Sequence, residues 1–114
     1  MFEAVMHIGQ EQLLIGKQRD CQRMVAFANM VLGELISQEY LDDPTQTAQG
    51  LEYLTQAAEL YKNNTEVLSQ EEYSRVNLGL STLYRHKGDQ VQSKRYLEMA
   101  KDKVTDKKVL LQFY

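Results

Sequence analysis

The scarcity of residues that break helices is the feature that most limits how this chain can fold. Its 114 residues include one proline and six glycines. A sandwich or barrel of short strands needs a turn signal about every 8–12 residues, and this sequence supplies too few of them. Apolar residues also recur three and four positions apart, as in Val76, Leu80, Leu83 and Tyr84, instead of alternating. Both patterns predict an all-α protein.

Capping residues divide the sequence into helices. Asp43 and Pro44 have the residue types of an N-cap and a first helical position. Residues 69–72 match the capping-box pattern, and Gly88 and Asp89 end one helix and cap the next. We therefore expect antiparallel helix pairs joined by tight turns, with about six helices over residues 2–15, 18–39, 45–62, 70–87, 90–104 and 106–113.

An internal repeat relates the two halves of the chain. Residues 29–36 match residues 77–84 at an offset of 48, with the shared pattern Asn-x-x-Leu-small-x-Leu-large. Residues 49–57 match residues 92–100 at an offset of 43, and a longer first turn absorbs the difference of five. Small residues in these segments suit close helix crossings, and large ones fill the spaces between helices. The pattern predicts two units, each made of a helix A, a turn and a helix B.

The second unit resembles a tetratricopeptide repeat (TPR). The family's order of large, small, aromatic, Gly-Asp, small, large and Ala positions is met over roughly 74–107 by Leu80, Ser81, Tyr84, Gly88, Asp89, Ser93, Leu97 and Ala100. The first unit, 26–62, is similar but has a longer turn and lacks the Gly-Asp pair. Asn29, Asn77 and Gln90 stand where the family often has an aromatic residue. A generic helical bundle is the alternative.

This resemblance implies one TPR-like domain over residues 1–114, built as a superhelical stack of helix pairs. Residues 1–17 would be an N-terminal capping helix, 18–62 the degenerate repeat, 69–105 the better-matched repeat and 106–114 a C-terminal capping or truncated helix. Such stacks usually need about three units. The apolar segment 109–114 would accordingly fold back, contact a second copy in a homo-oligomer, or begin a further repeat.

The resemblance also implies a concave face, lined by the A helices, that binds a protein or peptide. On the first A helix its positions would be Phe27, Met30, Val31, Glu34 and Gln38. On the second they would be Arg75, Leu78, Gly79, Thr82, Arg85 and His86. An apolar half beside a cationic half suits a peptide with apolar anchors and an acidic end, because arginine can hold a carboxylate through two hydrogen bonds.

Two asparagines, Asn29 and Asn77, recur in register and have two interpretations. A side-chain amide both donates and accepts, so it can pair with the backbone of an extended peptide. In bacterial peptide-sensing regulators built on this repeat, inner asparagines act in that way. In the other interpretation each asparagine bonds to a neighbouring helix. The peptide-contact interpretation leads to the alternative function. In it, the chain is a peptide-sensing or oligomerisation domain of a larger regulator, such as a transcriptional one.

Signals for an enzyme or a metal site are weak. The sequence has no Gly-rich phosphate loop, no H-E-x-x-H and no C-x-x-C. His7, Cys21 and His86 are isolated from one another, and a zinc site would need all three of them plus a carboxylate. Cys21 fits a small core residue. We therefore predict a non-enzymatic protein without catalytic residues, cofactor or metal; an unrecognised enzyme or metal-binding bundle is a less favoured alternative.

Charge and targeting signals bear on partners and compartment. The net charge is −3, yet residues 85–114 hold eight basic and four acidic residues, which form either a solvated face or a surface that steers an acidic partner or a second copy. The acidic whole and sparse aromatics disfavour nucleic acid. The lone Cys21, together with the absence of a signal peptide and of a long apolar run, predicts a cytoplasmic protein without membrane contact.

Overall fold

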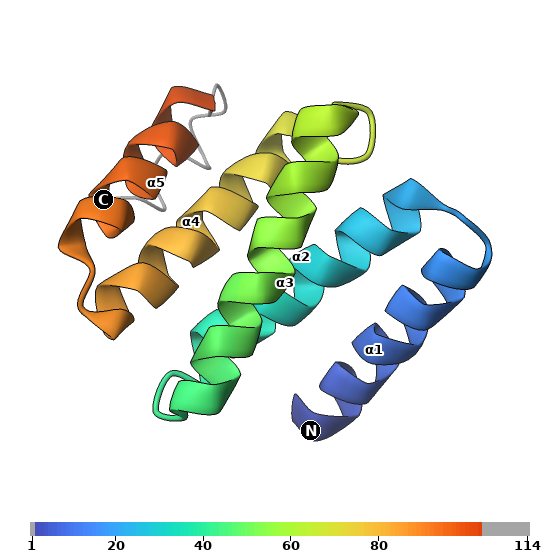
Figure 1. Cartoon of the computed structure of the whole chain (residues 1–114), viewed down its shortest axis with the longest axis horizontal. Coiled ribbons are helices and arrows are strands. Elements are labelled where there is room, and N and C mark those ends of the chain that lie inside the picture. Colours follow the sequence, from blue (N-terminus) through green and yellow to red (C-terminus); the bar gives the residue numbers. More distant parts are fainter. Residues whose placement is uncertain (1, 104–114) are drawn as a thin grey trace.

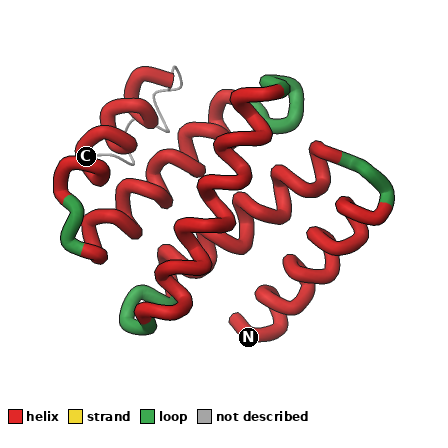
Figure 2. The backbone as a smooth tube through the Cα atoms, viewed as in Figure 1, coloured by secondary structure: helices red, strands yellow, loops and turns green. Residues whose placement is uncertain are grey.

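The computed structural model describes residues 2–103, which form five helices. In chain order they are α1 (Phe2–Gln18), α2 (Gln22–Glu39), α3 (Pro44–Asn63), α4 (Gln70–Lys87) and α5 (Gln90–Lys103). Figure 2 shows only helices and loops in this part of the chain. The prediction of an all-α fold is confirmed, and the sixth helix expected over 106–113 lies outside the described residues.

Neighbouring helices pack in pairs, and α4 holds the pairs together. The most extensive contacts join α2 to α3 and α4 to α5, while α1 packs on α2. Helix α4 also contacts both α2 and α3, so it lies in the angle between them. Figure 1 shows α1 and α5 at opposite edges of the molecule. The two pairs correspond to the two units of the internal repeat.

The predicted caps of α3 and α4 are present. The carboxylate of Asp43 accepts hydrogen bonds from the backbone N–H of Thr45 at 2.9 Å and of Gln46 at 3.3 Å. At the start of α4, the backbone N–H of Glu72 donates to Ser69 Oγ at 3.0 Å, and the backbone N–H of Ser69 donates to Glu72 Oε1 at 2.8 Å. These bonds satisfy N–H groups that have no partner inside the helix, so both helices begin where the sequence predicts.

The turn between α4 and α5 also follows the sequence. Gly88 has φ of +97°, a left-handed conformation that favours glycine and ends α4. Asp89 then accepts a hydrogen bond from the backbone N–H of Gln92 at 3.0 Å. A turn of this kind reverses the chain within two residues and brings α5 back along α4.

Equivalent small residues lie at the crossing of each helix pair. A Cβ atom on Gly33 of α2 would lie 3.2 Å from the carbonyl oxygen of Gly50 in α3 and would overlap the side chain of Leu54. At the equivalent crossing of α4 and α5, Ser81 Oγ donates to the carbonyl of Ser93 at 2.7 Å, and Ser93 Oγ donates to the carbonyl of Ser81 at 2.8 Å. The repeat therefore encodes the same close approach twice.

An ion pair links the start of α2 to the start of α4. It was not predicted from the sequence. Arg23 donates to both carboxylate oxygens of Glu72, at 2.7 and 3.1 Å, and to the carbonyl of Val67 at 2.7 Å. Its guanidinium lies 5.2 Å from the ring centroid of Phe27. The hydrogen bonds from Arg23, followed by that from the backbone of Ser69, lower the pKa of Glu72 below its usual value of 4.5.

Replacement of Gly33 by alanine is expected to lower the free energy of unfolding by about 1–3 kcal/mol, because the new methyl group meets Leu54 and the backbone of Gly50. Alanine favours a helix over glycine by roughly 1 kcal/mol, which moves the net loss toward the lower part of that range. Urea denaturation measures the change, with Gln56→Ala on the exposed side of α3 as the control. A Gly33→Ala variant more stable than the native chain would contradict the close crossing.

Substitution of Glu72 by glutamine is expected to lower the free energy of unfolding by about 1 kcal/mol at pH 7. Since the pKa of Glu72 is lower in the folded state, the stabilisation is complete above about pH 4.5 and is lost as the pH falls below that value. Urea denaturation between pH 7 and pH 3 should show the two proteins converging at low pH. Glu59→Gln, which removes an exposed carboxylate 4.0 Å from Lys62, should have little effect at any pH.

Candidate functional site

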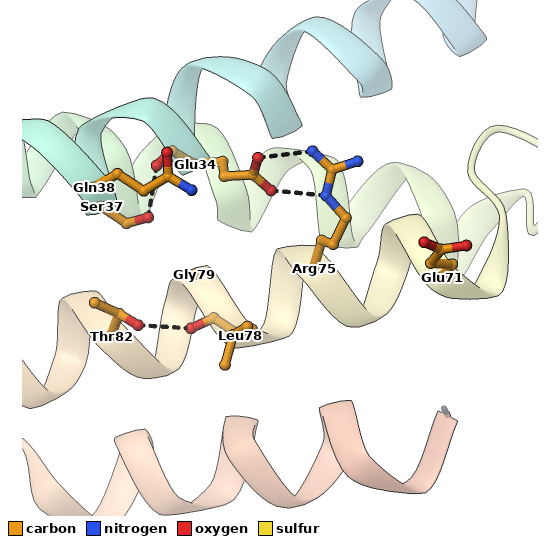
Figure 3. A pocket seen from close by; sticks show the side chains of 8 residues that line it. All are labelled: Glu34, Ser37, Gln38, Glu71, Arg75, Leu78, Gly79 and Thr82. Carbon is orange, nitrogen blue, oxygen red and sulfur yellow. Dashed lines mark hydrogen bonds and ion pairs between the residues drawn. The ribbon is translucent and has the colours of Figure 1, made fainter. Parts of the chain in front are cut away.

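A groove of about 500 Å³ lies between α2 and α4. Its walls come from the two helices expected to line a concave face, and Figure 3 shows Glu34 of α2 and Arg75 of α4 facing one another across it. The lining residues are Glu34, Ser37 and Gln38 of α2 with Glu71, Arg75, Leu78, Gly79 and Thr82 of α4. The structure thus brings together six of the residues predicted for the concave face: Glu34, Gln38, Arg75, Leu78, Gly79 and Thr82.

A bidentate ion pair crosses this groove. Arg75 Nε donates to Glu34 Oε2 at 2.9 Å, and Arg75 Nη2 donates to Glu34 Oε1 at 2.7 Å. Both side chains are partly buried, and the hydrogen bonds to Glu34 are the main reason that the pKa of Arg75 is raised. The sequence predicted Arg75 as a cation available to a ligand. In the structure the guanidinium of Arg75 is already paired with Glu34, because α4 packs against α2.

The other polar groups of the groove differ in whether they are available to bind a ligand. Ser37 Oγ donates to the carbonyl of Glu34 at 2.7 Å, and Thr82 Oγ1 donates to that of Leu78 at 3.1 Å, so both hydroxyl protons stay within their own helices. The side chains of Gln38 and Glu71 are exposed. With two glutamates and one arginine, the lining is slightly acidic, which corrects the expectation of a cationic half here.

Three predicted site residues are buried instead of facing the groove. The side chains of Asn29, Met30 and Asn77 are 0% exposed. Each asparagine lies four residues before the small residue of its helix crossing, Gly33 or Ser81, and therefore on the same packed face. The structure corrects their assignment, because a ligand in the groove does not reach these side chains.

The hydrogen bonds of the two asparagines follow neither interpretation fully. Asn29 Nδ2 donates to the carbonyl of Val25 at 2.9 Å, within its own helix instead of to a neighbour. Its Oδ1 and both side-chain amide atoms of Asn77 have no partner among the residues that the structure describes. An interior amide with unmet hydrogen bonds lowers stability, so these positions contribute to the packing pattern at some cost.

The remaining predicted site residues lie outside this groove. Phe27 is 41% exposed and lies beneath the guanidinium of Arg23. Arg85 is exposed and lines a neighbouring cleft between α4 and α5, and His86 lines a third cleft beside α3. Val31 is partly buried against the core. The residues predicted for one concave face are therefore distributed over several surfaces of the structure.

Residues considered for catalysis or metal binding are dispersed. Cys21 is exposed at the N-cap of α2, which corrects its expected place in the core. His7 lies 3.0 Å from Glu11 on the exposed side of α1, and His86 is at the far end of α4. Between residues 2 and 103, no three His, Cys, Asp or Glu side chains are grouped closely enough to hold a metal ion.

Comparison with protein-family models, curated protein sequences and solved structures finds no match to this chain. The TPR resemblance accordingly rests on the residue pattern over 74–107 and on the repeat of helix pairs. Over the part of the chain that the structure describes, no helix has both the length and the apolar character needed to cross a membrane.

The Glu34–Arg75 pair predicts a clear result from charge exchange. Glu34→Arg or Arg75→Glu alone places like charges about 3 Å apart and should lower the free energy of unfolding by about 1–2 kcal/mol. The double variant restores an opposite pair and should recover more than half of that loss. Urea denaturation of all four proteins gives the coupling energy. Additive effects would show that the pair does not join α2 to α4.

Proposed function

We propose that this chain is a non-enzymatic, TPR-like module that binds a protein or peptide segment in the groove between α2 and α4. The observation that carries the proposal is the groove itself, about 500 Å³ in volume, open between the two helices that occupy equivalent places in the repeat. Grooves of this size with a few directed polar groups are the usual setting for a ligand. The comparisons add no support to this function.

The chemistry of the lining favours a segment with hydrogen-bond donors or a basic side chain. Leu78 supplies an apolar contact for such a segment. The amide of Gln38 can both donate and accept, so it takes the role first expected of the asparagines. The exposed carboxylate of Glu71 adds negative charge to the groove. The groove therefore favours a neutral or basic peptide instead of the acidic-ended peptide expected from the sequence.

The same groove would serve a free-standing adaptor or the peptide-sensing part of a larger regulator. Both uses require the chain to hold a ligand segment and differ only in what the binding controls. Membership of the TPR family, the cytoplasmic location and the absence of catalysis remain predictions from the sequence.

A random peptide library displayed on phage tests the proposal. We expect the folded chain to select peptides that lose at least about tenfold in affinity, or about 1.4 kcal/mol, when Gln38→Trp fills the groove. Fluorescence anisotropy with each selected peptide measures this change.

Two control variants locate the binding surface. Thr55→Trp adds the same bulk to an exposed position on α3, and Lys94→Glu changes the neighbouring cleft, so neither should alter the affinity. Circular dichroism confirms that each variant keeps its helices. Selection of no peptide, or of peptides that bind Gln38→Trp normally, would overturn the assignment.

A further inference from the structure

A second cleft, of about 380 Å³, lies between α4 and α5. Its lining residues are Leu78, Ser81, Thr82 and Arg85 of α4 with Gln90, Ser93, Lys94 and Leu97 of α5. It shares Leu78 and Thr82 with the α2–α4 groove, and its other six residues are its own. The function proposed above does not use them.

The repeat register identifies what this cleft corresponds to in the first unit. Offsets of 48 for the A helices and 43 for the B helices map its lining onto Met30, Gly33, Glu34, Ser37, Thr47, Gly50, Leu51 and Leu54. That surface of α2 and α3 is the seat on which α4 packs. A Cβ atom on Gly79 would lie 2.8 Å from Leu54, one on Gly50 would lie 3.1 Å from Leu83, and Arg75 pairs with Glu34. The α4–α5 cleft is thus the next helix seat of the same design.

Equivalent residues of the two seats differ in burial, as expected if a helix packs on the first seat but not on the second. In the first seat, on which α4 packs, Ser37 is 7% and Thr47 is 6% exposed. Their equivalents in the second seat, Arg85 and Gln90, are exposed in the described structure. The second seat is therefore exposed at positions where the first is covered.

Its charge indicates which kind of helix. Arg85 replaces the neutral Ser37 and Lys94 replaces the apolar Leu51, while Thr82 replaces the acidic Glu34. No acidic residue lines the cleft, and within residues 2–103 neither Arg85 nor Lys94 forms an ion pair. Two unpaired cations beside the apolar Leu78 and Leu97 are complementary to an amphipathic helix with acidic side chains.

We propose that the α4–α5 cleft binds an acidic amphipathic helix of a partner protein, in the position that α4 occupies on the first unit. The contacts of α4 define the pattern. Gly79 packs on Leu54 and Leu83 lies over Gly50, so a small residue and, four later, a large apolar one would face Leu97 and Ser93.

The acidic positions follow from the same register. Thr82 and Ser37 both line the α2–α4 groove, and His86 and Leu51 both line the cleft beside α3. Residues equivalent to Thr82 and His86 would therefore approach Arg85 and Lys94. The partner helix has the order small-x-x-acid-apolar-x-x-acid, with the two acids one turn apart.

Charge also distinguishes this occupant from the chain's own segments. Residues 104–114 contain Lys107 and Lys108 but only one acidic residue, Asp106, so their net charge has the same sign as the cleft. The last turn of α4, which contains Arg85, His86 and Lys87, is likewise basic in a second copy. An external acidic helix would not meet the electrostatic repulsion expected between the cleft and residues 104–114 or the α4 helix of a second copy.

Synthetic helices test the proposal directly. The probe is a fluorescein-labelled peptide of residues 69–87 that carries Thr82→Glu and His86→Glu, and its matched control carries Thr82→Lys and His86→Lys. Binding to the full chain is measured by fluorescence anisotropy. We expect the glutamate peptide to bind at least about tenfold more tightly, with the preference shrinking as salt is added.

Variants of the full chain establish the site. Arg85→Glu combined with Lys94→Glu should reverse the preference, so that the lysine peptide binds more tightly. Arg95→Glu, a single charge reversal at an exposed position of α5 outside the cleft, should leave the preference in place. Equal binding of the two peptides, or a preference that survives the reversal, would overturn the proposal.

Two further outcomes identify a different occupant. Glutamate-peptide binding that occurs only after Leu110→Asp and Leu111→Asp would assign the cleft to residues 104–114. Self-association in sedimentation experiments that Arg85→Glu and Lys94→Glu abolish would assign it to a second copy. If neither peptide binds the native chain or any of these variants, the interpretation of the cleft as a helix-binding surface is wrong. Because the variants leave Glu34, Gln38 and Arg75 unchanged, the α2–α4 groove is judged separately.

Discussion

The packing of Leu54 between α2 and α4 is the contact on which the described structure depends. This side chain is completely buried, and the missing Cβ atoms of Gly33 and Gly79 leave the space that it fills. A methyl group at either position would crowd Leu54, more severely at Gly33 than at Gly79, so glycine at these positions favours the close approach of the three helices. Placement of α4 in turn forms the α2–α4 groove.

The two helix seats show how one packing plan gives surfaces of different character. The first seat is closed by α4 and held by the Glu34–Arg75 pair. In the second seat, serine replaces both crossing glycines, and the hydroxyl groups of Ser81 and Ser93 bond across to the opposite helix. The packed positions thus keep small residues, while Arg85 and Lys94 at the rim change the charge.

Local patterns in the sequence were sufficient for the helices and their ends. Helical periodicity, the Asp43 cap, the Ser69–Glu72 box and Gly88 all act through neighbours within one or two turns, so their effect is readable from spacing. The close crossings were also foreseen, because small residues repeat at fixed positions. The site was foreseen less well: a helical position facing inward toward a neighbouring helix and one facing the groove can lie next to each other, as Asn77 and Leu78 do.

Long-range pairing was beyond what the sequence could show. Arg23 and Glu72 are 49 residues apart, and Glu34 and Arg75 are 41 apart, so no local spacing relates them. The sequence by itself determined an all-α chain of repeated helix pairs, because helix formation and close crossings depend on residue type and period. Only the tertiary structure decided which cations are paired and which remain open. That depends on how α4 turns against α2 and α5, which is a property of the packed helices together.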